Sequence, residues 1–366
     1  MQTSFAAIPA AGAVLAVDLG AIAANFCDLA RLHGPGATAA VLKADAYGLG
    51  AAAIAPALHA AGCRHFFVAY LEEALALRPL VPGAMLAVLN GLLPGTDMDY
   101  IADDLTPVLG SLAEIDQWRD AARNAGRPLS AILHVDTGMN RLGLDAVGVA
   151  ALAASPERLD GIPLRYLMTH LVASEAAENP INRQQAIRFA AACARLPAAP
   201  RSIANSSGIF LGPEFASDLA RPGAALYGIN PTPGRPNPMR PSCRLCARVL
   251  AVHDVAAGER VGYNGIWAAP RRSRIATVSI GYADGFLRSQ SNRGSAVFDG
   301  RAVPLVGRVS MDLTTFDVTD HPGIVPGAWL DLIGPGRTVD DVAQDACTNG
   351  YEVLTRFGPR IARVYR

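Results

Sequence analysis

Short apolar runs alternate with alanine-rich stretches between residue 38 and about residue 222, and this pattern restricts the chain to few folds. The runs are nearly continuous, which is typical of strands buried on both faces of a sheet. Eight strands with helices between them predict an α/β fold that begins with a (β/α)8 barrel of the TIM type. The last two runs are short, so a different number of α/β units is the alternative. The runs span residues 38–44, 65–70, 84–89, 105–110, 129–136, 164–170, 201–206 and 219–223.

Three of the intervening stretches carry clear helix signals, at residues 48–62, 111–126 and 179–197. In the second of them, Ser111 is placed to cap the helix N-terminus and Glu114 completes a capping box. A further strand-like run at residues 13–19 precedes the barrel, and we expect it to pair elsewhere.

The pattern changes after the proline-rich segment 230–242, which predicts a linker. The following runs are rich in β-forming residues, and Asp299-Gly300 predicts a hairpin turn between two of them. Only residues 338–346 look helical in this part. We therefore expect a cofactor-binding barrel at residues 1–233, with residues 1–19 pairing with the second domain, and a mostly-β C-terminal domain at residues 234–366.

Charge and cysteine content exclude several classes of protein. The formal net charge is zero, which gives no reason to expect nucleic acid or an anionic membrane as a partner. Six cysteines in 366 residues make no disulfide framework, and Cys243 and Cys246 lack a second pair at zinc-site spacing. The N-terminus has no basic segment, and no apolar run is long enough to cross a bilayer. We expect a cytoplasmic protein without a metal.

The chain has 32 Lys plus Arg residues, and Lys43 is its only lysine. Lys43 ends the first predicted barrel strand, and barrel enzymes carry their active sites at the carboxyl ends of the strands. A lysine that extends its stem along the barrel rim is the alternative interpretation. Because arginine serves every other cationic position and cannot give up its proton, a site that kept lysine favours a deprotonatable, nucleophilic amine.

The segment "ANSSG" at residues 204–208 follows the seventh predicted strand. Barrel enzymes often bind phosphate in the loops after strands seven and eight, although an ordinary helix-capping serine explains the segment equally well. A Schiff-base lysine together with a phosphate site indicates pyridoxal 5'-phosphate (PLP) as the cofactor.

Nine motifs, in order along almost the whole chain, resemble those of the bacterial alanine racemases, which are PLP-dependent barrel enzymes. Five lie in the predicted barrel: "VLKADAYGLG", "HVDTGMNRLGL", "MTHLVASE", "ANSSG" and "RPGAALYG". Four lie in the β domain: "VGYNGIW", "IGYADGF", "GRVSMD" and "NGYEV". The resemblance implies a homodimer that interconverts L-alanine and D-alanine and supplies D-alanine for peptidoglycan. A serine or broad-specificity amino-acid racemase of the same fold is the alternative.

The resemblance also implies roles for individual residues. Lys43 would hold the cofactor as a Schiff base and act as one acid/base group, and Tyr263 of a second subunit would act as the other. His170 would pack against the pyridine ring and Arg221 would contact the pyridine nitrogen. The implied cofactor site consists of Lys43, Tyr47, His170, Ser206, Arg221, Gly223, Ala224 and Tyr351.

The remaining implied residues concern the substrate. Arg141 would orient the substrate carboxylate or the cofactor phenolate, while Met311 and Asp312 of the partner subunit would complete the pocket. Tyr282 and Arg288 match the gate and support positions of the family.

Racemisation removes the Cα proton from one face and returns a proton to the other, so two bases suffice. A tyrosine with a pKa of about 10 is a poor base at neutral pH, and we expect a cationic neighbour of Tyr263, with Arg288 as the candidate. Arg221 does not donate its proton, so we expect the pyridine nitrogen to stay unprotonated, which limits side reactions.

The sequence departs from the family pattern at a position where relatives often carry a carbamylated lysine that bridges to the arginine matched by Arg141. His134 stands there, and it forms no stable carbamate. We therefore expect another negative group, a bound anion or a nearby carboxylate, to hold Arg141. Asp45 and Leu49 also replace the usual Asn and His of the lysine signature.

Overall fold

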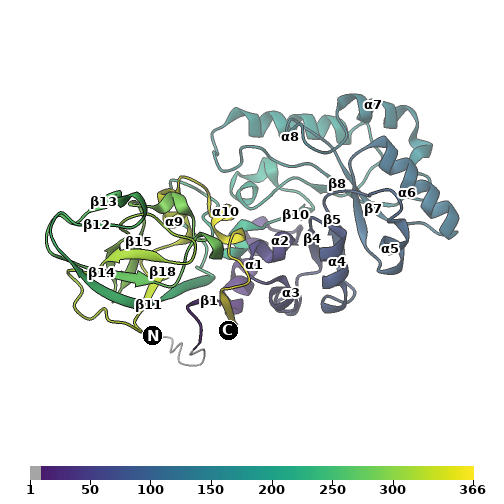
Figure 1. Cartoon of the computed structure of the whole chain (residues 1–366). Coiled ribbons are helices and arrows are strands. Elements are labelled where there is room, and N and C mark those ends of the chain that lie inside the picture. The colour runs from purple at the N-terminus through teal and green to yellow at the C-terminus, as the bar shows by residue number, and fades with distance from the viewer. Residues whose placement is uncertain (1–9) are drawn as a thin grey trace.

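The structure, a computed structural model, describes residues 10–366. It places a parallel barrel beside a mostly antiparallel β domain, shown on the right and left of Figure 1. No helix in this range is long and apolar enough to cross a membrane.

The barrel wall is built from short parallel strands that follow one another in chain order. Seven of them form one sheet: β3 (Ala40–Val41), β4 (His65–Val68), β5 (Met85–Val88), β6 (Thr106–Leu109), β7 (Ala131–His134), β8 (Leu164–Met168) and β9 (Arg201–Ser202). A parallel pair, β2 (Ala37–Thr38) with β10 (Leu219–Ala220), lies at the remaining gap. Most of these strand residues are buried, as expected for a sheet covered on both faces.

The segment that contains β2 and β3 closes the barrel, because it pairs with one neighbour on each side. The backbone N–H groups of residues 37, 39 and 41 donate to the carbonyls of residues 218, 220 and 222 at 2.8–3.0 Å. Further along the same segment, β3 pairs with β4. Arg221 N–H donates to the carbonyl of Ala204 at 2.8 Å and joins the segment that follows β9 to the segment that follows β10. The predicted (β/α)8 barrel is confirmed, but its first strand is split into β2 and β3 and ends at Val41 rather than at residue 44.

Helices cover the outside of the barrel (Figure 1). Their bounds are α1 (Leu19–His33), α3 (Ala51–Ala60), α4 (Leu71–Leu77), α5 (Asp97–Ala102), α6 (Leu112–Ala125), α7 (Ala146–Ala154) and α8 (Pro180–Cys193). The capping box predicted for α6 is present: the Ser111 hydroxyl accepts from the Glu114 N–H at 3.2 Å and donates to the Glu114 carboxylate at 3.0 Å.

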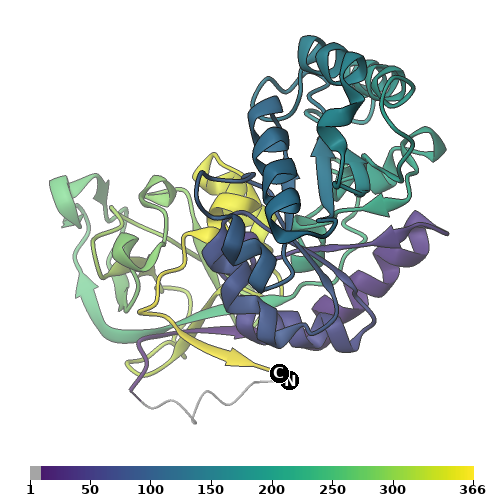
Figure 2. The same cartoon turned by 90° about the vertical axis from the view of Figure 1, so that its right-hand side faces the viewer.

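The C-terminal domain is organised around the long strand β11 (Cys243–Val255). It pairs with β1 (Ala13–Val17), β14 (Ser273–Val278) and β18 (Trp329–Ile333), all antiparallel. β1 also pairs with the last strand, β19 (Ala362–Tyr365), in parallel, and Figure 2 shows this yellow strand beside the purple first strand. The segment between residue 230 and β11 contains no helix or strand.

Smaller elements complete the domain: β12 (Arg260–Val261), β13 (Trp267–Ala268), β15 (Ser295–Phe298), β16 (Arg301–Pro304), β17 (Thr314–Asp317) and α9 (Val339–Ala346). β15 and β16 form the predicted hairpin, and Asp299 and Gly300 both have positive φ, at 48° and 76°. The short helix α10 (Gly350–Thr355) was not predicted, and it lies against the barrel. Cys243 and Cys246 are both buried on β11 with free thiols.

Candidate active site

A cavity of about 850 Å³ lies at the carboxyl ends of the barrel strands. The barrel supplies most of its walls, and α10 supplies Tyr351 and Thr355. Eight of the site residues implied by the sequence line it from the barrel side: Lys43, Tyr47, Arg141, His170, Ser206, Arg221, Gly223 and Ala224. The structure therefore brings together residues that are separated by up to about half the chain.

Lys43 begins an unusual left-handed turn, α2 (Lys43–Tyr47). Ala44, Asp45, Ala46 and Tyr47 all have φ between 52° and 57°, although none is a glycine. Each such residue costs about 1–2 kcal/mol of backbone strain, so four in succession persist only where neighbouring groups hold them. The turn reverses the direction of the chain directly after β3, and this explains why the strand ends earlier than predicted.

Hydrogen bonds from three parts of the chain hold this turn. Asp45 accepts from the N–H of Ala51 at 2.7 Å, and Glu73 accepts from the N–H of Ala44 at 2.6 Å. The guanidinium of Arg363, on β19, donates to the carbonyl of Gly48 at 2.9 Å. Asp45, which differs from the usual family residue, thus has a structural role, because its carboxylate accepts a hydrogen bond that holds the turn. The contact of Glu73 with this turn was not predicted. The only feature of the sequence that could have indicated it is the position of Glu73 in the first turn of α4.

The surroundings of Lys43 disfavour its charged form. Burial lowers the pKa of its amine, the nearby Arg141 lowers it further, and Glu73 opposes this shift. A lowered pKa increases the fraction of neutral amine, which is the nucleophilic and basic form.

His134 and His170 are both neutral at physiological pH. Burial, together with the charge of Arg221, lowers the pKa of His134 to about 4. The same two causes, followed by the charges of Arg141 and Lys43, lower the pKa of His170 to about 3. A neutral imidazole is suited to packing against an aromatic ring, whereas it offers no negative charge to Arg141.

Arg221 is 5% exposed and is fixed by its terminal nitrogens. One of them donates to the carbonyl of Thr169 at 2.6 Å and the other donates to the Ser202 hydroxyl. Within residues 10–366, no hydrogen bond from its Nε is present, so this donor is available to a ligand in the cavity. Burial lowers the pKa of Arg221 to about 9, which leaves the guanidinium protonated at neutral pH.

A second set of donors lies around Ser206. Its hydroxyl oxygen accepts from the N–H groups of Gly223 and Ala225 at 3.0 and 3.2 Å. A side chain at position 223 would clash, because a Cβ there would lie 2.4 Å from the Tyr47 hydroxyl oxygen. Both N–H groups are thus engaged by Ser206, whereas the Ser206 hydroxyl donates its proton to no other described residue. A free hydroxyl donor beside a position that requires glycine fits a phosphate group.

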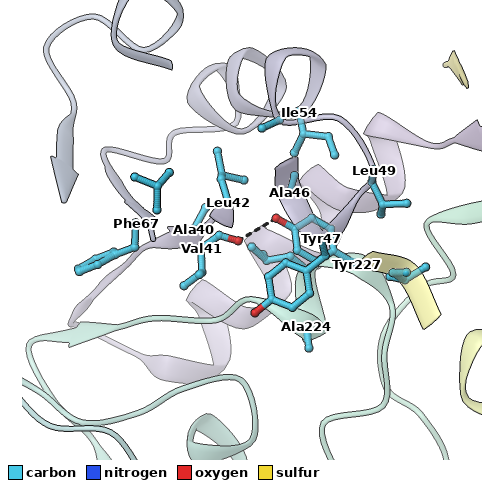
Figure 3. Close-up of a cluster of buried hydrophobic side chains, with 14 of the residues drawn as sticks. Ala40, Val41, Leu42, Ala46, Tyr47, Leu49, Ile54, Phe67, Ala224 and Tyr227 are labelled. Carbon is cyan, nitrogen blue, oxygen red and sulfur yellow. Dashed lines mark hydrogen bonds between the residues drawn. The ribbon is translucent and has the colours of Figure 1, made fainter. Parts of the chain in front are cut away.

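Three tyrosines pack beside this set of donors. The Tyr47 ring lies 4.9 Å from that of Tyr227 and 6.2 Å from that of Tyr351, measured between centroids. Figure 3 shows Tyr47 and Tyr227 in a cluster of buried side chains that includes Ala40 and Val41 of β3. The Tyr227 hydroxyl donates to the Val41 carbonyl at 2.8 Å. Burial raises the pKa of Tyr47 to about 12, so its hydroxyl keeps its proton and can donate it.

Tyr351 already has a partner. Its hydroxyl donates to the carboxylate of Glu175, and burial followed by this hydrogen bond raises the pKa of Tyr351. A phosphate that used the same hydroxyl proton would compete with Glu175. No pattern in the sequence indicates this contact, because residues 175 and 351 lie on different domains of the predicted fold.

Arg141 lies on the loop after β7 and lines the cavity. Within residues 10–366, no carboxylate forms a hydrogen bond or ion pair with its guanidinium. Asp136 is engaged elsewhere, because it accepts from the N–H groups of Gly138 and Met139 at 2.8 and 2.9 Å. A bound anion and a nearby carboxylate were the two groups expected to hold Arg141. Because no carboxylate of the described residues does so, the bound anion stays a prediction.

The other predicted residues lie away from this cavity. Tyr263, Tyr282, Arg288, Met311 and Asp312 all belong to the C-terminal domain, and none of them lines the cavity formed by residues 10–366 of one chain. Tyr263 and Met311 are 67% and 54% exposed. The described residues show no hydrogen bond between Arg288 and Tyr263, so the proposed cationic neighbour of Tyr263 stays a prediction.

The cavity fits PLP. Lys43 offers a partly buried amine, Arg221 offers a free Nε donor, and the Ser206 hydroxyl beside Gly223 offers a donor for the phosphate. No groups of His, Cys, Asp and Glu that could hold a metal ion occur among residues 10–366.

Comparison with known proteins gives consistent results. The family model described as alanine racemase, N-terminal domain, matches residues 17–231, and that for the C-terminal domain matches residues 242–365. The alanine racemase of Acidiphilium cryptum is 58% identical over 96% of this chain and 98% of its own. That of Rhodospirillum rubrum is 50% identical over 97% of this chain and 96% of its own.

Solved structures of alanine racemases resemble this chain over almost its whole length. The crystal structure of alanine racemase from Bartonella henselae with covalently bound pyridoxal phosphate superposes with a TM-score of 0.94 at 40% identity, covering 97% of this chain and all of that chain. The biosynthetic alanine racemase from Pseudomonas aeruginosa superposes with a TM-score of 0.90 at 34% identity, covering 97% of this chain and 99% of its own.

Proposed function

The chain belongs to the alanine racemase family, and we propose that it interconverts L-alanine and D-alanine with PLP, using Lys43 and Tyr263 as the two bases. The observation that carries this proposal is the position of the only lysine, which lies in the cavity with its pKa lowered by burial and by Arg141.

The cofactor, when bound, delocalises the negative charge that forms at the substrate Cα and makes the Cα proton acidic. Lys43 would hold the cofactor, and its amine then removes or returns that proton on one face of the substrate. The lowered pKa supports this role, because a base works best when its pKa lies near the working pH.

Tyr263 acts on the opposite face and comes from a second subunit. This assignment is supported by its distance from the cavity of its own chain and by its neighbours in the domain. Several large apolar side chains on the same domain are exposed, namely Tyr263, Ile266, Tyr282, Met311 and Leu313. Exposed apolar side chains in such numbers are typical of a surface that another protein covers. A homodimer would bury them and bring Met311 and Asp312 to the substrate.

The other proposed cofactor contacts are hydrogen bonds to the phosphate and the pyridine nitrogen, and packing against the ring. Ser206, the amides beside Gly223, and Tyr47 would hold the phosphate, while His170 packs against the ring as a neutral imidazole. Arg221 would donate from Nε to the pyridine nitrogen. Because its guanidinium keeps its own proton, that nitrogen stays unprotonated and side reactions that need a stronger electron sink are disfavoured.

Arg141 lacks a carboxylate partner and so is free to bind the substrate carboxylate or an anion beside it. Tyr351 would reach the phosphate only by exchanging its bond with Glu175. Tyr282 and Arg288 would frame the entrance from the partner subunit. We propose that the enzyme is cytoplasmic and supplies D-alanine for peptidoglycan.

The test is to incubate the purified protein with L-alanine and, separately, with L-serine, and to measure the D-enantiomer while recording the visible spectrum. We expect the absorption of bound cofactor and turnover of alanine. Turnover of serine at a comparable rate would replace the alanine assignment with the broad-specificity alternative. Absence of any visible band would refute PLP binding.

A further inference from the structure

Two loops of the C-terminal domain are hydrogen-bonded to each other. We call them the Tyr282 loop (residues 279–285) and the Met311 loop (residues 305–313). The N–H groups of Tyr282 and Ala283 donate to the carbonyls of Ser310 and Met311 at 3.0 and 2.9 Å. A Cβ at Gly281 would lie 2.2 Å from the Met311 carbonyl oxygen, so only glycine permits this approach.

Arg360, which lies just before β19, contacts both loops. Its Nε lies 3.0 Å from the carboxylate of Asp284, and its Nη1 lies 2.7 Å from the carboxylate of Asp312. Its own segment is attached to the first loop as well, because Gly358 N–H donates to the Asp284 carbonyl at 3.1 Å. One planar guanidinium thus joins the end of each loop.

Asp284 depends on this contact more than Asp312 does. Its side chain is 8% exposed, and one of its oxygens accepts from the Gly281 N–H at 2.9 Å while the other faces Arg360. Removing the guanidinium leaves a nearly buried carboxylate with a single donor. Such a group must move toward water or recruit another partner, and either change displaces the Tyr282 loop.

We propose that Arg360 is a positioning residue for racemisation, because it fixes the two loops that carry Tyr282, Met311 and Asp312 to the substrate pocket of the partner subunit. This inference rests on the proposed function and its dimer. It assigns a role to a residue that touches neither substrate nor cofactor. The fork geometry is required, since a lysine ammonium contacts one of the two carboxylates at a time.

The first measurement compares three variants as loaded enzymes. We expect Arg360→Ala to lower kcat/KM for L-alanine by roughly tenfold to a hundredfold, with a higher KM, because small displacements of positioning groups are costly in rate. Arg360→Lys should recover part of this loss. Arg271→Ala is the matched control: Arg271 forms an exposed ion pair with Asp320 at 2.6 Å in the same domain, with 56% of its side chain exposed against 53% for Arg360.

Cofactor affinity separates positioning from general damage. Every residue proposed to hold PLP lies on the barrel or α10, so titration of cofactor-free protein with PLP should give the same Kd for Arg360→Ala and wild type, within about twofold. A Kd that rises in parallel with the loss of activity would overturn the proposal, since it would indicate a disturbed fold.

Mixed dimers test which site Arg360 serves. In a dimer of wild type with a Lys43→Ala/Arg360→Ala subunit, the only competent lysine faces loops that lack Arg360. In a dimer of Arg360→Ala with Lys43→Ala, the competent lysine faces intact loops. We expect the second dimer to be faster by the same factor that separates wild type from Arg360→Ala. The opposite order would overturn the proposal, because Arg360 would then act within its own subunit.

A readout independent of activity separates this inference from the proposed function. Hydrogen–deuterium exchange at residues 279–285 and 305–313 should be faster in Arg360→Ala than in wild type, and unchanged in Arg271→Ala. Unchanged exchange in Arg360→Ala overturns the inference even if the enzyme racemises alanine. If wild type forms no D-alanine, the proposed function fails on that result alone, and the exchange data still decide whether Arg360 holds the loops.

Discussion

His134 is expected to make the folded protein sensitive to acid, and the effect can be worked out from its environment. The side chain is 9% exposed, and burial with the charge of Arg221 holds its pKa at about 4, against 6.5 for a free histidine. Because the folded pKa lies below the unfolded one, the unfolded chain binds the proton more readily between these values. The stabilising contribution of the neutral ring is therefore complete above pH 6.5 and is lost as the pH falls toward 4.

Each pH unit in this window changes the free energy of unfolding by about 1.36 kcal/mol per group, so His134 alone accounts for a loss of about 3 kcal/mol between pH 6.5 and 4. The His134→Gln variant has a neutral side chain at every pH and lacks this contribution. The charge of His134 is only the smallest of the causes that lower the pKa of His170, so the losses from His170 and from the carboxylates largely cancel when the two proteins are compared.

The assay is urea unfolding of cofactor-free wild type and His134→Gln, followed by circular dichroism at several pH values and one protein concentration. We expect the wild type to lose about 3 kcal/mol more than the variant between pH 6.5 and 4. Parallel pH dependence in the two proteins would refute the reasoning, because it would mean that His134 is charged, or solvated, in the folded state.

Four further outcomes are expected. Borohydride reduction of the loaded enzyme should fix the cofactor on Lys43 alone, and peptide mass spectrometry that finds it elsewhere contradicts the site. Tyr263→Phe should lose about 100-fold or more of its L-to-D racemisation rate, whereas full activity in both directions would show that another group is the second base. Ser206→Ala removes the acceptor of two buried N–H groups and should lower the free energy of unfolding of the cofactor-free protein by about 1–3 kcal/mol, measured with urea. Ala44→Gly should raise the same quantity by about 0.5–1 kcal/mol, because glycine adopts the left-handed turn without strain; a lower unfolding midpoint would argue against that turn.

Much of the fold was accessible from local patterns. The eight apolar runs each contain a barrel strand, and the capping box at Ser111 and the turn at Asp299-Gly300 formed as expected. These features depend on residues that are neighbours in the chain. The two errors have a different origin: the first strand was drawn through residue 44, and α10 was missed. Both segments are held by contacts between distant parts of the chain. The spacing of apolar residues along the sequence carries no information on such contacts.

The sequence alone determined that the chemistry centres on Lys43, since a chain with one lysine offers one amine for a Schiff base. It also determined that no lysine carbamate can compensate Arg141. Only the tertiary structure decided how the neutral form of that amine is favoured, because its lowered pKa arises from burial and from Arg141, which lies about a hundred residues away along the chain. Only the tertiary structure showed the left-handed turn after Lys43, and that the Tyr263, Tyr282 and Met311 segments lie outside the cavity of their own chain. Charge, strain and distance depend on the folded arrangement of remote residues, whereas the chemical capacity of a side chain depends on its identity.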